Sequence, residues 1–87
     1  MDRNEYEPMK AGIYRAITVT PAGKLGRVNW AEAEQAAAAL GRETDRARWA
    51  FITEALEEMQ ARDEGTIWAP SLLMMARTAR EAYGRAA

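Results

Sequence analysis

The stretch DRARWAFITEALEEMQARD, residues 45–63, is the segment that decides the fold. Its apolar side chains recur at i, i+3, i+4 and i+7, at Ile52, Ala55, Leu56 and Met59. This spacing places them on one face of an α-helix, and the charged residues between them fall on the other face. The segment therefore predicts an amphipathic helix, and the rest of the chain must supply elements that cover its apolar face.

Two more helices are predicted, one on each side of this segment. The segment 29–40 begins at Asn29, a good helix-capping residue, and stops before Gly41. The segment 72–83 follows Ser71, which is a second capping residue. We expect the core to be built from Ile52, Leu56 and Met59, with Leu40, Leu72 and Tyr83 against them.

The N-terminal third of the chain predicts a different kind of structure. Pro8 and Gly12 break helical periodicity, so residues 1–12 are expected to be irregular. Residues 13–28 contain a β-branched run, a Pro and Gly turn, and a short apolar return, which predicts a β-hairpin. The predicted fold for residues 1–87 is a single small α+β domain, mainly α, with this hairpin packed on a three-helix unit.

Composition limits the classes of function. The chain has 87 residues, a net charge of −1, and neither histidine nor cysteine. These absences remove the usual general base near neutral pH, the usual thiol nucleophile and the soft metal ligands. A domain of this size buries only about 60% of its unfolded surface, so it often depends on a partner chain or on dimerisation.

No motif in the sequence predicts catalysis. Glu54, Glu57 and Glu58 lie on one predicted solvated helix face, whereas a paired-carboxylate hydrolase needs two acids across a cleft. Gly23 and Lys24 form the one Gly-Lys pair, and the other residues of a phosphate-binding loop are missing. We therefore predict that the protein is not an enzyme, and we expect no catalytic, cofactor-binding or metal-binding residue.

Leu73 and Met74 are the first candidate site. The predicted helix 72–83 already has an inward face, and Leu73 and Met74 lie about 100° and 200° around from Leu72. Either the hairpin covers these two side chains or they meet another chain. With Trp49 or Phe51 nearby, they predict a protein interface, formed with a different protein or with a second copy.

Three arginines after the turn glycine Gly41 are the second candidate site: Arg42, Arg46 and Arg48. Residues 33–52 resemble a helix-turn-helix, in which the second helix enters the DNA major groove with its first residues. The resemblance implies that these arginines contact phosphates or bases. It is weakened by Arg42, which stands where an apolar residue commonly follows the glycine, and by Glu43 and Asp45, which would face phosphates. The alternative is an ordinary helical hairpin with a charged corner.

Two functions follow from these sites. The first is a non-enzymatic protein-binding module, acting as a regulator, inhibitor or adaptor of a larger partner. In size and composition alone the chain is similar to small accessory proteins of phages and mobile elements, anti-CRISPR inhibitors among them, and no motif carries this analogy. The second is a helix-turn-helix DNA-binding regulator. The polar N-terminus and the lack of a long apolar run predict a cytoplasmic protein without membrane contact.

Overall fold

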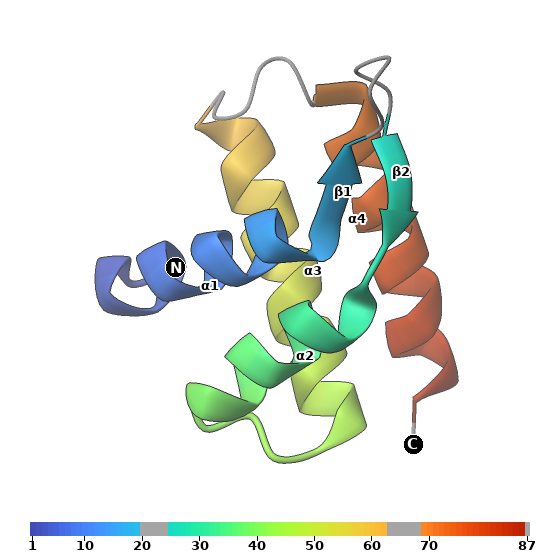
Figure 1. Ribbon diagram of the computed structural model, residues 1–87. Helices are drawn as coiled ribbons and strands as arrows, with labels where there is room; N and C mark the ends of the chain where they lie inside the picture. Colours follow the sequence, from blue (N-terminus) through green and yellow to red (C-terminus); the bar gives the residue numbers. More distant parts are fainter. Residues whose placement is uncertain (20–24, 63–68, 87) are drawn as a thin grey trace.

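The computed structural model describes residues 1–19, 25–62 and 69–86 and is mainly helical (Figure 1). Its elements in chain order are α1 (Arg3–Ala16), β1 (Ile17–Val19), β2 (Leu25–Val28), α2 (Trp30–Ala39), α3 (Asp45–Ala61) and α4 (Ala69–Arg85). The prediction of a mainly helical chain is confirmed. The described residues form four helices where the sequence predicted three.

The additional helix is α1, and it corrects the predicted irregular N-terminus. Four side chains on one face of α1 are completely buried: Tyr6, Met9, Ile13 and Ala16. Their spacing of three, four and three residues is that of an amphipathic helix. The carboxylate of Asp2 caps the helix by accepting a hydrogen bond from the Asn4 N–H at 2.9 Å. The predicted strand beginning at residue 13 is therefore wrong over residues 13–16, which are helical.

Pro8 lies inside α1 and does not break it. Proline removes one intrahelical hydrogen bond and costs about 3 kcal/mol in a helix interior. Burying large apolar side chains such as Tyr6 and Met9 contributes roughly 1.5–3 kcal/mol each, which is enough to offset that cost. The apolar face decides the conformation of this segment.

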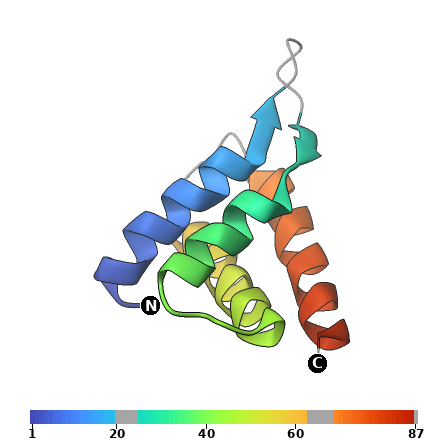
Figure 2. The ribbon, with the colours of Figure 1, turned by 60° about the horizontal axis from the view of Figure 1, so that its bottom comes forward.

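The β-hairpin predicted over residues 13–28 is not confirmed in that form. Its place is taken by two very short strands, β1 and β2, which pair antiparallel. Ile17 lies opposite Val28 and Val19 lies opposite Leu25, and the register is irregular between Ile17 and Val19. Figure 2 shows this ribbon at one end of the molecule, where β1 continues from α1. The Pro and Gly turn of the predicted hairpin occupies residues 20–23 of the sequence, and these lie outside the described residues.

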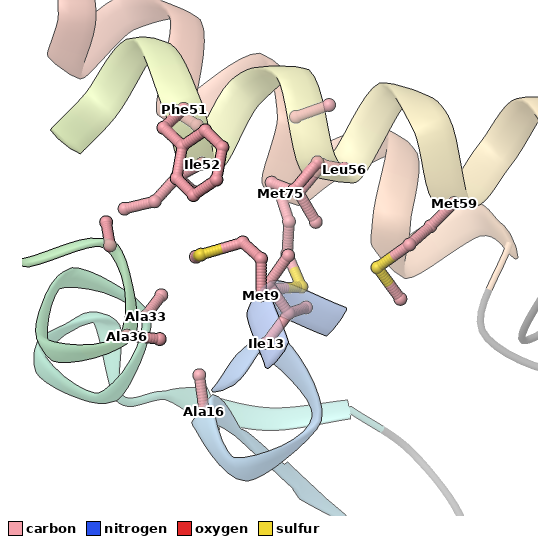
Figure 3. Close-up of a cluster of buried hydrophobic side chains, with 14 of the residues drawn as sticks. Met9, Ile13, Ala16, Ala33, Ala36, Phe51, Ile52, Leu56, Met59 and Met75 are labelled. Carbon is pink, nitrogen blue, oxygen red and sulfur yellow. The ribbon is translucent and has the colours of Figure 1, made fainter. Parts of the chain in front are cut away.

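The core is organised around α3, which packs against α1, α2 and α4. Figure 3 shows side chains from α1, α2 and α4 converging on Ile52 and Leu56 of α3. Of the residues predicted to form the core, Ile52, Leu56, Met59 and Leu72 are buried, which confirms the predicted facing of α3. Leu40 and Tyr83 are only partly buried.

The predicted helices lie close to their observed positions. The hydroxyl of Thr44 accepts a hydrogen bond from the Ala47 N–H at 3.1 Å and caps α3 where the sequence predicted its start. α2 begins and ends one residue inside its predicted range, and α4 extends beyond its predicted range at both ends. The predicted end of α3, at residue 63, lies outside the described residues.

Among the helices in the described ranges, none is both long and apolar enough to cross a lipid bilayer.

Candidate protein-binding surface

Leu73 and Met74 on α4 are exposed, at 51% and 64% of their surface. The neighbouring residues on the helix explain why. The side chains of α4 that face the core are Leu72, Met75, Ala76 and Ala79. Because α4 turns about 100° per residue, Leu73 and Met74 must point away from that face. The short β-ribbon does not cover them, so the alternative of intramolecular cover is not realised in the described structure.

Trp49 and Phe51, the other two residues of the predicted interface, lie elsewhere. Phe51 is buried in the core at 3% exposure. Trp49 is partly exposed and meets Trp30 of α2 edge to face, with ring centroids 5.4 Å apart. Trp49 lies in the half of α3 that adjoins the C-terminal end of α4, because Arg46 contacts Tyr83 there. Leu73 lies ten residues before Tyr83, about 15 Å along the helix.

The structure therefore does not bring the four predicted interface residues together. The sequence could not reveal this, because the separation depends on the antiparallel packing of α3 and α4. Among the large apolar side chains of the described residues, Leu73 and Met74 are the two most exposed. Their neighbours along α4 are polar: Arg77, Thr78, Arg80 and Glu81 are all exposed.

The polar residues beside the apolar pair differ in how they are held. Arg80 is fixed to α3, because its Nε and Nη2 donate to Oε1 of Glu57 at 3.0 and 2.8 Å. Arg77 and Glu81 take part in no ion pair with the residues that the structure describes. Arg80, beside the surface formed by Leu73 and Met74, is therefore fixed by an ion pair. Arg77 and Glu81 add one positive and one negative charge that have no ion-pair partner among the described residues.

Arg42, the first arginine of the predicted DNA contact, joins three parts of the chain. Its guanidinium forms an ion pair with Glu5 of α1 and donates to the Leu40 carbonyl at 2.9 Å. It also lies over the ring of Phe51 on α3, 3.8 Å from the centroid. Arg42 is partly buried in this position and connects α1, the end of α2 and α3.

Arg46 fastens α3 to the end of α4. Its Nη2 donates to the Tyr83 hydroxyl at 3.0 Å, and its guanidinium lies 4.4 Å from the centroid of the same ring. A longer contact of 3.5 Å reaches the carbonyl of Ala86. Both partners are about 40 residues away in sequence, so no local pattern predicted this role.

Arg48 stabilises the corner between α2 and α3. Its Nη1 donates to the Glu43 carbonyl at 2.9 Å, and its Nη2 pairs with Asp45 in the first turn of α3. The arginines that the sequence grouped into one DNA-contacting set therefore have separate contacts within the chain.

Within the described ranges, no group of three or more acidic side chains is placed to hold a metal ion. A surface hollow of about 490 Å³ is lined by Arg27, Val28, Asn29 and Trp30 among the described residues. Since none of these four is an acid or base that exchanges protons near neutral pH, they provide no acid–base chemistry.

Comparison with known proteins gave no relative: no family model, no curated protein and no solved structure matches this chain.

Proposed function

We propose that this chain is a small protein-binding module that acts through Leu73 and Met74 on α4, in the role of a regulator, inhibitor or adaptor. The observation that supports this proposal is the exposure of the two side chains, at 51% and 64%, beside a core whose large apolar residues are buried. Full burial of a Leu or Met side chain contributes roughly 1.5–3 kcal/mol, so a partner that covers this pair gains appreciable affinity.

The rigidity of α4 supports the same proposal. Leu72 and Met75 anchor the helix in the core on either side of the exposed pair. The Arg80–Glu57 and Arg46–Tyr83 contacts attach α4 to α3 further along. A surface that is held in place before binding loses little conformational entropy when its partner arrives.

DNA binding is the weaker alternative. Each of the three arginines that would contact DNA already has partners within the chain. Reaching a phosphate would require at least some of these contacts to break, and a net charge of −1 supplies no general attraction to DNA. No observation on the structure favours DNA over protein as the partner.

Affinity capture from the native cells, with quantitative mass spectrometry, tests the proposal. The tagged wild-type chain is compared with the double variant Leu73→Asp and Met74→Asp. We expect the double variant to remain folded by circular dichroism, because both side chains are exposed, and to lose the proteins that the wild type captures.

Tyr14→Asp is the matched control. Tyr14 is the third large apolar side chain that is exposed in the described structure, at 38%, and it lies on α1. This variant should capture the same proteins as the wild type. Equal capture by the wild type and by the Leu73/Met74 double variant would show that binding, if any, uses another surface.

A further inference from the structure

The outward-facing side of α4 presents a narrow row of exposed residues along the helix. Met74, Arg77, Glu81 and Gly84 are all exposed and are separated by three, four and three residues. Residues so spaced lie along one side of a helix, as the a and d positions of a coiled coil do, although here Met74 is apolar and Arg77 and Glu81 are charged. Met74 and Glu81 occupy the a positions, and Arg77 and Gly84 the d positions. We call these four residues the α4 stripe.

The charges of the α4 stripe complement each other when two copies meet antiparallel. In such a pair each a position faces a d position of the other helix. A two-fold axis level with Ala79 places Arg77 of one copy against Glu81 of the other, and the same contact occurs twice by symmetry. Both charged side chains are exposed and without an ion-pair partner among the described residues, so both are available for this contact.

The apolar position of the α4 stripe also finds a matching partner. The same axis places Met74 of one copy over Gly84 of the other. A Cβ built on Gly84 would meet no atom within 4 Å, so the space above this glycine is open. The long and flexible Met74 side chain, which is 64% exposed in the single chain, fits a position where the opposing residue has no side chain.

The positive charge that this arrangement brings near the axis is paired within each chain. Arg80 flanks the α4 stripe and would approach its own copy near the axis. Its guanidinium is held by Glu57 through two hydrogen bonds of 2.8 and 3.0 Å. Glu57 therefore offsets the charge of Arg80 in each copy and reduces the repulsion between the two helices.

We infer that the partner of the α4 surface is a second copy of this chain, bound through an antiparallel α4–α4 contact in which Arg77 pairs with Glu81. This inference rests on the proposed function, because it takes α4 as the binding surface and names what covers it. A contact made by one helix from each chain is small, so the dimer forms weakly and reversibly.

Sedimentation equilibrium of the purified full chain, from about 1 μM to about 1 mM, measures the dimer over the range expected for a small interface. The wild type should dimerise within this range. Arg77→Glu places a glutamate opposite Glu81, and Glu81→Arg places an arginine opposite Arg77. Since each change converts two attractions into two repulsions per dimer, either variant should weaken dimerisation about tenfold or more.

Mixing the two single variants gives the sharpest test. In a mixed pair, the two glutamates of the Arg77→Glu chain face the two arginines of the Glu81→Arg chain. We therefore expect the mixture to form a heterodimer at protein concentrations at which each variant alone is mainly monomeric. The double variant Arg77→Glu and Glu81→Arg should dimerise like the wild type. Arg3→Glu makes the same charge change at the start of α1 and should leave dimerisation unchanged, because Figure 2 shows that end of α1 on the opposite side of the molecule from α4.

Three outcomes would overturn the inference: a wild type that stays monomeric throughout, single variants that dimerise like the wild type, or a mixture that forms no heterodimer. Circular dichroism of every variant is the control, and it should show that the monomer is still folded. Failure of this inference is separate from failure of the proposed function. A monomeric chain that captures a protein through Leu73 and Met74 would contradict the inference alone.

Discussion

Gly12 of α1 lies so close to Ala36 of α2 that a Cβ built on Gly12 would be 2.5 Å from the Cβ of Ala36. Real Cβ atoms do not approach one another so closely, and the obstructing atom belongs to a short side chain that has no rotamer to move into. The two helices therefore pack at a distance that requires a glycine at position 12. This contact fixes how α1 lies across α2.

We predict that Gly12→Ala destabilises the fold by about 1–3 kcal/mol, because overpacking outweighs the gain of about 1 kcal/mol in helix propensity. Urea denaturation followed by circular dichroism measures the change. The matched control is Gly84→Ala on α4, where the added Cβ meets open space. Measured at dilute concentration, this control should keep or slightly raise stability. A Gly12→Ala variant as stable as the control would contradict the close packing of α1 on α2.

Leu56 lies at the centre of the core and is completely buried. Leu56→Ala should lower the free energy of unfolding by about 2–5 kcal/mol, since it removes buried surface and leaves a cavity. Thermal denaturation shows this as a large fall in Tm. Leu73→Ala makes the same chemical change at an exposed position and should change stability by less than about 0.5 kcal/mol. Similar losses in both variants would mean that the facing of α3 or of α4 is wrong.

Arg42 contributes to stability through its contacts with Glu5, the Leu40 carbonyl and the Phe51 ring. Arg42→Ala should destabilise the fold by about 1–2 kcal/mol, because a partly buried ion pair and a cation–π contact are both lost. Arg77→Ala, which removes an arginine with no ion-pair partner among the described residues, is the control and should have little effect. If the two variants unfold at the same urea concentration, Arg42 does not join α1 to α3 in solution.

Duplex DNA should not bind appreciably to this chain at about 50 mM salt, where even non-specific DNA-binding proteins give a signal. The reason is that Arg42, Arg46 and Arg48 are engaged within the chain. Fluorescence anisotropy of a labelled duplex measures this. Binding that falls steeply with added salt and disappears in Arg46→Ala would instead support the helix-turn-helix alternative.

The local pattern of the sequence was sufficient for the central helices. Ile52, Leu56 and Met59 recur at helical spacing, so both the existence of α3 and its buried face could be predicted. The same periodic signal was present in α1 at Tyr6, Met9, Ile13 and Ala16. It was outweighed in the prediction by Pro8 and Gly12, because a sequence shows the local cost of these residues and not the burial that compensates it.

The candidate site, too, was predicted in part from the sequence and decided in part by the tertiary structure. Helical geometry alone placed Leu73 and Met74 outside the inward face of α4. Whether another element covers them depended on where the ribbon lies, and only the tertiary structure decided that they remain exposed. The arginines formed one cluster in sequence but separate contacts in space, because Glu5 and Tyr83 reach Arg42 and Arg46 from opposite ends of the chain. Periodicity reports the neighbours within a helix, whereas contacts between residues about 40 positions apart depend on how the helices pack.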